Sequence, residues 1–393
     1  MVPLTAPPLL RFLRRPSDRW IVALLVVTVL AIVVQQSLTH VDYNFEIFRR
    51  SFRHLAAGRD LYVAYPDEQV DLFKYSPTFA LLFLPFATLP TLLALALWDG
   101  LNVGLLWFSM RCLLPRRDAQ IALAIMYLEI VRTTQRAQSN ALVTALMVLA
   151  FVWLEERQQV VAVFAIVVGT SVKLFPALAI IPAIFHPRRA RLALVALVGG
   201  VVALLLPLVV TSPAELLAQY RSWGALERLD AFAGPTGGAG GLYGGVMHWV
   251  RLAFHVTWPN LPIQLAGLAV LLAPLARVDQ WELPLFRLRL LASILLFCTI
   301  FNHQVESPSF VIAMAGTAIW FVSSERRGVD VALLAVVLVI VSLGTNDVMP
   351  DAIRDPIIRY KLKTLPVFAL WIVVQSELFG LRRGPLRLAA CER

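Results

Sequence analysis

The chain has 393 residues, of which 59% are hydrophobic and only 15% are charged, whereas soluble proteins have about 25% charged residues. This balance excludes an ordinary soluble domain and predicts a polytopic membrane protein. The formal net charge is +10, but the basic residues form short clusters between apolar segments, as loop charges do under the positive-inside rule. We therefore expect no nucleic-acid partner.

The first predicted span covers residues 20–34. No small-residue cleavage site follows it, so it is predicted to be a retained span rather than a signal peptide. Four arginines between residues 11 and 19 precede it, which predicts a cytoplasmic N-terminus. Twelve more apolar segments follow along the chain: 77–89, 91–114, 119–131, 140–154, 159–172, 174–186, 192–211, 262–276, 285–301, 308–323, 330–343 and 364–378.

Arginine clusters near residues 188–191 and 382–387 belong on the cytoplasmic side, which places the C-terminus there too. If both ends lie inside, the number of spans must be even, so one of the thirteen segments must fail to cross or must merge with a neighbour. The region 77–114 is the suspect, because its prolines interrupt helices and it carries Asp99 and Asn102 in mid-segment. We expect one all-α domain over residues 1–393 with about twelve transmembrane helices.

Three outer loops are predicted, at 35–76, 212–260 and 344–363. In the first loop Phe45, Phe48, Phe52 and Leu55 recur at helical spacing opposite charged residues. This pattern predicts an amphipathic helix lying in the membrane interface. Gly58 is the predicted end of that helix.

Asp42 and the arginines of the first loop are the first candidate site. Asp42 could simply cap the amphipathic helix, but arginines such as Arg49 and Arg53 crowd an outer loop where the positive-inside rule disfavours them. An anion outside the membrane could offset their charge, and a lipid phosphate is the obvious candidate. Simple contact with anionic headgroups is the other explanation.

Lys173 is one of only four lysines and lies in an apolar stretch that breaks at Pro176. An ionisable group there indicates function, unless the lysine merely extends to the membrane surface. Gln138 and Asn140 open another apolar segment with amides that can bind hydroxyl-rich ligands, or that only cap a helix.

The last candidate cluster, in the stretch "FNHQVESPSF" at 301–310, contains His303 and Glu306. They lie three residues apart and share a face if the stretch is helical. His303 could donate to a phosphate and Glu306 could orient it or hold a sugar hydroxyl. An ordinary helix end is the alternative.

Together these motifs resemble glycosyltransferase family 87. The resemblance rests on an aspartate in the first outer loop, "LY" at 61–62, "KYSPTFALLFLP" at 74–85, "AQSN" at 137–140 and "VKLFP" at 172–176. Ala137 departs from the family, which tends to have glycine there. The family belongs to the GT-C class of polytopic transferases, whose known members are mannosyltransferases that use a polyprenyl-phosphate sugar.

The resemblance implies an inverting transfer from a polyprenyl-phosphate sugar to a lipid or glycan acceptor at the outer face of a bacterial inner membrane. It implies Asp42 as the base, and Lys173 and His303 at the donor phosphate. We expect Arg49 and Arg53 to assist there and Gln138, Asn140, Glu306 and Tyr62 to bind substrate, with neither metal nor cofactor. A transporter or lipid flippase is the main alternative; it would carry ionisable groups deep in several spans.

Overall fold

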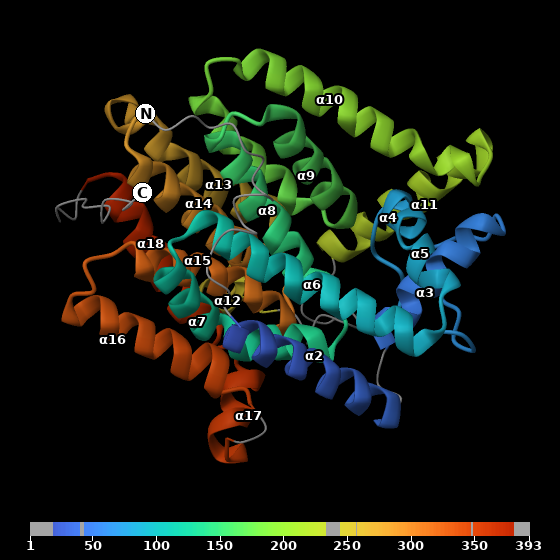
Figure 1. Ribbon diagram of the computed structural model, residues 1–393, viewed down its shortest axis with the longest axis horizontal. Coiled ribbons are helices and arrows are strands. Elements are labelled where there is room, and N and C mark those ends of the chain that lie inside the picture. Colours follow the sequence, from blue (N-terminus) through green and yellow to red (C-terminus); the bar gives the residue numbers. More distant parts are fainter. Residues whose placement is uncertain (1–18, 40–42, 233–243, 257, 347–348, 381–393) are drawn as a thin grey trace.

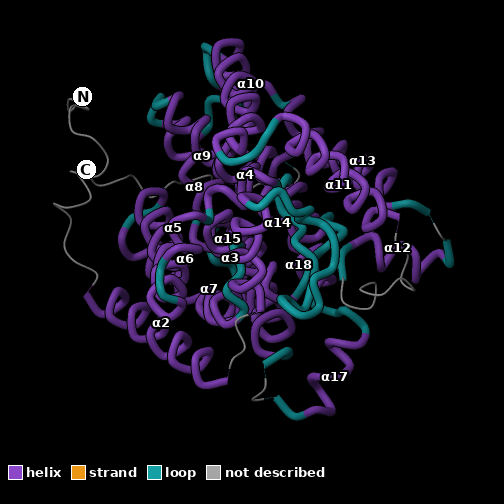
Figure 2. The backbone as a smooth tube through the Cα atoms, turned by 90° about the vertical axis from the view of Figure 1, so that its right-hand side faces the viewer, coloured by secondary structure: helices purple, strands orange, loops and turns teal. Residues whose placement is uncertain are grey.

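The structure, a computed structural model, describes residues 19–39, 43–232, 244–256, 258–346 and 349–380. Every regular element in these ranges is helical, as predicted (Figure 1). Figure 2 shows the same described segments as helix and loop alone. The α-helices are α2 Arg19–Thr39, α3 Tyr43–Ala56, α4 Pro77–Leu82, α5 Leu84–Thr88, α6 Thr91–Leu113, α7 Arg116–Gln135, α8 Asn140–Glu155, α9 Gln159–Val172, α10 Arg189–Leu205, α11 Pro213–Phe232, α12 Val246–Phe254, α13 Asn260–Leu272, α14 Pro284–Ile300, α15 Phe310–Val322, α16 Gly328–Val337, α17 Asp351–Arg359 and α18 Thr364–Leu378.

Short segments of other helical types connect or extend these helices. The 3-10 segments are η1 Phe175–Phe185, η2 Leu206–Val209, η3 Ala273–Ala276, η4 Val278–Gln280 and η5 Ser307–Ser309, and η6 Leu338–Leu343 is a π-helical turn. In η1, Pro182 lacks the backbone N–H that the interior of an α-helix needs, whereas Pro176 lies in the first turn, where proline is tolerated. The predicted apolar segment at 174–186 is therefore a 3-10 segment rather than an α-helix.

Helices α8, α14 and α15 form the centre of the bundle. In α8 every residue other than Trp153 and Glu155 is buried, and in α15 every residue other than Phe321. Helices α6, α7, α9 and α18 pack around this centre. A helix that is apolar on all sides is typical of the interior of a large bundle.

Among the described residues, three helical segments are long and apolar enough to cross a membrane: Arg19–Thr39, Thr91–Leu113 and Arg189–Val209. The last of these, α10 with η2, lies along one edge of the bundle (Figure 1) and leaves large apolar side chains such as Leu197 and Val202 more than half exposed. Water does not favour an apolar surface of this extent, whereas lipid does. The chain is therefore a membrane protein.

Residues 77–89, part of the region suspected of not crossing, form only two short helices, α4 and α5, which meet at Phe83. Six residues of α-helix rise about 9 Å, far less than the roughly 30 Å of the bilayer core. Residues 91–113, by contrast, form the single helix α6 with Asp99 and Asn102 buried in it. The count of twelve spans stays a prediction, because several other apolar helices have only 10–17 residues.

The predicted amphipathic helix of the first outer loop is α3. Its apolar residues Phe45, Phe48 and Leu55 are at most 1% exposed. Phe48 makes edge-to-face contacts with Tyr75, Phe79, Phe83 and Trp98, at centroid distances of 4.9–5.9 Å. The apolar face of α3 is thus covered by the protein itself, and its placement in a membrane interface stays a prediction.

Two helix ends near the candidate site adopt the same hydrogen-bonded turn. At the end of α3, Gly58 has a φ of +68°, and the amides of Gly58 and Arg59 bind the carbonyls of Leu55 and His54. Two crossed bonds of this kind around a left-handed residue form a Schellman motif. Gly58 is therefore confirmed as the end of the helix.

The end of α7 repeats this turn with Ala137 in the left-handed position, at a φ of +47°. The amide of Ala137 binds the carbonyl of Thr134, and the amide of Gln138 binds that of Thr133. Trp98 Nε1 also donates to the Ala137 carbonyl over 2.8 Å. A glycine suits a left-handed residue better than an alanine does, which gives a physical reason for the glycine that the resemblance expects here.

Phe48→Ala should lower the melting temperature of the detergent-purified protein strongly, because a buried Phe→Ala change costs about 3–5 kcal/mol. Phe52→Ala on the same helix is the matched control, since Phe52 is only half-buried. A thermal-shift measurement compares the two. Equal, small effects would show that α3 is not held by this aromatic cluster.

Ala137→Gly should leave the protein as stable as the wild type or slightly more stable. Glycine removes about 1–2 kcal/mol of left-handed strain from the folded state. Its larger loss of backbone entropy on folding destabilises the folded state by about 0.5–1 kcal/mol. Ala122→Gly, at a fully buried position inside α7, should instead destabilise by about 1 kcal/mol. Thermal melting that gives both changes the same sign would contradict the assignment of the turn.

Candidate active site

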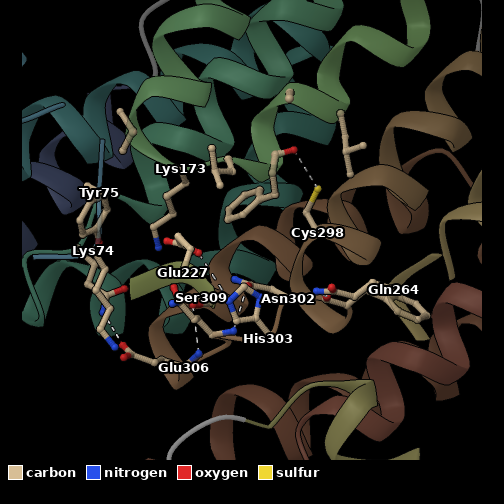
Figure 3. Close-up of a pocket in the computed structure, with 18 of the residues that line it drawn as sticks. Lys74, Tyr75, Lys173, Glu227, Gln264, Cys298, Asn302, His303, Glu306 and Ser309 are labelled. Atoms are coloured by element: carbon tan, nitrogen blue, oxygen red, sulfur yellow. Dashed lines mark hydrogen bonds and ion pairs between the residues drawn. The ribbon is translucent and has the colours of Figure 1, made fainter. Parts of the chain in front are cut away.

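A cavity of about 450 Å³ lies where α3, α11, α13 and α14 meet the segments that follow Asp71, Val172 and Phe301 (Figure 3). This volume is in the range of small-molecule sites, which are mostly apolar with a few placed polar groups. Phe48, Phe175 and Phe297 are among its apolar lining residues. Its charged or titratable lining residues are Asp71, Lys74, Lys173, Glu227, His303 and Glu306.

A chain of hydrogen bonds joins four of the predicted site residues. Lys173 Nζ donates to Asn140 Oδ1 over 2.6 Å, and Asn140 Nδ2 donates to Gln138 Oε1 over 2.5 Å. Gln138 Nε2 then donates to Glu306 Oε2 over 2.7 Å. The structure thus brings together Lys173, Asn140, Gln138 and Glu306, which the sequence placed on three separate stretches.

Local structure explains how each of these residues reaches the cavity. Gln138 directly follows the left-handed residue of the turn that ends α7, and Asn140 is the first residue of α8. Lys173 follows the last residue of α9, where the backbone becomes extended before the proline-containing η1. Glu306 caps the short η5 segment, with its amide bound to Ser309 Oγ. Glu306 thus combines a local capping position with a place in the cavity wall.

His303 lies in the cavity beside α11. Its Nε2 is 3.9 Å from Glu227 Oε2. Glu227 in turn accepts a hydrogen bond of 3.2 Å from Trp223 Nε1, one helical turn earlier. Figure 3 shows Lys173, Glu227, His303 and Glu306 converging from different helices and loops. One cavity thus contains cations that can meet an anion and carboxylates that can accept from hydroxyl groups.

The two predicted arginines point elsewhere and do not line the cavity. Arg49 donates to Glu46, to Thr91 and to the Leu89 carbonyl, and Arg53 donates to the Ala87 carbonyl. Tyr62 does not line the cavity either; its ring stacks behind that of the cavity residue Trp223, with centroids 6.5 Å apart. These three residues surround the site rather than form its wall.

Asp42, the predicted base, lies outside the described residues. Asn44, two positions later, lines the cavity and donates to the Arg136 carbonyl over 2.9 Å. Two residues of extended chain span at most about 7 Å, which limits the distance along the backbone from Asn44 to residue 42.

Carboxylates within the chain offset the arginines of the predicted first outer loop. Glu46 pairs with Arg49 and Arg50, while Glu68 pairs with Arg50, His54 and Arg59. The hydrogen bonds from His54 and Arg59 lower the pKa of Glu68 to about 2, and burial lowers the pKa of His54. The expectation that an external anion must balance this charge therefore loses its main support.

Lys74, Asp71, Trp223 and Glu227 also line the cavity, although they were not predicted as site residues. Lys74 was visible as one of four lysines and as the first residue of "KYSPTFALLFLP". Trp223 and Glu227 lie at positions i and i+4 of α11, so they share a face. No pattern in the sequence shows that this face meets the 301–306 turn.

A second polar cluster lies behind the 301–306 turn. Lys363 Nζ is 3.3 Å from Glu129 Oε1 and donates to Ser307 Oγ over 3.0 Å. Arg132 also pairs with Glu129 and donates to the carbonyls of Val341 and Ser342. Glu129 is fully buried, and breaking a buried ion pair leaves an uncompensated charge. This cluster fixes the backbone next to Glu306.

Within residues 19–39, 43–232, 244–256, 258–346 and 349–380, no three His, Cys, Asp or Glu side chains are grouped so that they could hold a metal ion.

Comparison with known proteins agrees with the motifs. No curated protein matches the chain. Residues 73–301, more than half of the chain, match the profile of glycosyltransferase family 87. This range includes Lys74, Gln138, Lys173 and Glu227 of the cavity and the buried Asn140 that joins two of them. The chain belongs to glycosyltransferase family 87.

Proposed function

We propose that this glycosyltransferase moves mannose from a polyprenyl-phosphate donor to a lipid or glycan acceptor at the outer face of the bacterial inner membrane. One observation carries the proposal: a single cavity joins Lys173 and His303 with the carboxylate of Glu306 and the amide of Gln138. Cations suit a phosphate, and amides and carboxylates suit sugar hydroxyls. A donor of this kind contains both groups.

Lys173 and His303 would meet the donor phosphate. As the bond to the anomeric carbon breaks, the phosphate oxygen gains negative charge. A positively charged hydrogen-bond donor aimed at that oxygen stabilises the transition state more than it stabilises the bound sugar phosphate. A single phosphate leaves, rather than a nucleotide diphosphate, so the mechanism does not require a metal clamp.

Asp42 would act as the base. The acceptor hydroxyl loses its proton to the carboxylate while its oxygen attacks the anomeric carbon from the face opposite the phosphate, which inverts that centre. The position of Asn44 at the cavity wall supports this role, because Asp42 is only two residues away along the chain.

Gln138, Asn140 and Glu306 would orient the sugar and the phosphate, and Tyr62 would support Trp223 from behind. The proposed site leaves out Arg49 and Arg53, because their guanidinium groups bind backbone carbonyls of residues 87–89. The transporter alternative has no support from the family to which the chain belongs.

Asp42→Asn should abolish transfer in purified protein while leaving its melting temperature unchanged, because an amide keeps the volume but cannot take a proton. Loss of a general base costs about 100- to 10,000-fold in rate. The assay follows radiolabelled mannose from a polyprenyl-phosphate donor into lipid or glycan products. Wild-type turnover in this variant would refute the base assignment and leave Asp42 as a helix cap.

Orientation provides a second test. A cysteine at Ala64, in the first outer loop, should react with an impermeant thiol reagent added to spheroplasts, whereas a cysteine at Ala190 should not. Both alanines are exposed, and Ala190 lies in the arginine cluster that the positive-inside rule places in the cytoplasm. The background lacks Cys112 and Cys391 and retains the buried Cys298. Labelling at Ala190 with protection at Ala64 would invert the proposed topology.

A further inference from the structure

Two neutral amides separate one cation of the cavity, Lys173, from one of its carboxylates, Glu306. Lys173 lies at one end of the hydrogen-bond chain and Glu306 at the other, with Asn140 and Gln138 between them. Asn140 is fully buried and Gln138 is 7% exposed. Each contact is a hydrogen bond of 2.5–2.7 Å between side chains.

The chemistry of the two ends fixes the direction of both amides. An ammonium group can only donate and an ionised carboxylate can only accept. Asn140 must therefore turn its oxygen to Lys173 and its nitrogen toward Gln138, whose own nitrogen must turn to Glu306. The observed bonds follow this direction at all three contacts.

The separation determines the charge that the cavity presents. A lysine in direct contact with a carboxylate forms a neutral pair, whereas a lysine held by an amide oxygen keeps its positive charge. Among the ion pairs of the described residues, none joins Lys173 to a carboxylate within 4.0 Å. Beyond its amide partner, the ammonium group lies 5.7 Å from the ring centroid of Tyr75, another lining residue.

We propose that Asn140 and Gln138 are positioning residues that form an amide spacer, which prevents Lys173 and Glu306 from neutralising each other. The cavity then has a cationic end for a phosphate ester and an anionic end for a hydroxyl-rich group. This inference rests on the proposed function for the identity of the ligand, and it adds the reason why the two amides stand between the charged residues.

The test replaces the amide by a carboxylate of the same size. Farnesyl phosphate, which has a phosphate monoester and no sugar, is the probe, and its binding is measured with full-length protein in nanodiscs. Asn140→Asp should weaken binding more than tenfold, as should Lys173→Met, because the new carboxylate would neutralise the lysine. Asn140→Ala leaves the lysine charged and should weaken binding less than Asn140→Asp does.

A double variant separates a positioning role from a structural one. Asn140→Asp combined with Lys173→Met should bind no more weakly than Lys173→Met alone, since the carboxylate acts through the lysine. Wild-type affinity in Asn140→Asp would overturn the spacer. A fold-loss of affinity in the double variant equal to the product of the two single-variant losses would overturn it too. If Asn140 only packed, the alanine variant would be the weakest binder, which also contradicts the proposal.

Thermal melting of each variant checks folding. If Asn140→Asp yields no folded protein, Gln138→Glu provides the same test from the second amide, with at least a threefold weaker affinity expected and wild-type affinity contradicting the spacer. If the order of affinities holds but the wild type transfers no sugar from a polyprenyl-phosphate donor, the proposed function fails and the spacer stands. A wild type that binds no farnesyl phosphate would overturn both.

Discussion

Polar groups inside an apolar bundle must find their partners in the protein, because no bulk water is there to replace a missing hydrogen bond. This constraint determines the arrangement of the cavity. The amides of residues 138 and 140, the ammonium group of Lys173 and the carboxylate of Glu306 are each bound to the next in line. The helices that carry them are held in register by these contacts as well as by apolar packing.

The same constraint explains where the other charges lie. Glu129, with no exposed surface, takes both Lys363 and Arg132 as partners. Glu68 in the first outer loop is approached by two arginines and a histidine. Glu129 and Glu68 are thus each shared among several cations. Lys173 differs from these cations, because its hydrogen-bond partner is the neutral amide of Asn140 rather than a carboxylate.

The sequence predicted the helical membrane architecture and the family. Among the charged or imidazole side chains of the cavity it singled out Lys173, His303 and Glu306 but not Asp71, Lys74 or Glu227. Lys173, Gln138, Asn140 and Glu306 were recognisable because polar residues interrupt apolar stretches. The partners of Arg49 and Arg53 were not predictable, because carbonyls of residues 87–89 approach them only after α3 packs against α5 and α6.

Other parts of the fold could not be predicted for a similar reason. Trp223 and Glu227 look like ordinary positions of an amphipathic helix, and only the tertiary packing of α11 brings them to the cavity. Short apolar segments also do not reveal whether they form one long helix or two short ones. Residues 77–89 form two short helices, and it was the prolines of this region that indicated an interruption.

The bond between Gln138 and Glu306 joins residues 168 positions apart, which has a consequence for biosynthesis. At about 5–20 residues per second, the ribosome needs roughly 10–30 s to produce the second partner after the first. During that time the amide side chains lie in a partly assembled protein. Asn140 can already bind Gln138 and then Lys173, which follows only 33 residues later. Gln138 Nε2 gains its acceptor only after the ribosome has synthesised the 301–306 turn. The hydrogen-bond chain of the cavity is therefore completed late in synthesis, when Glu306 becomes available.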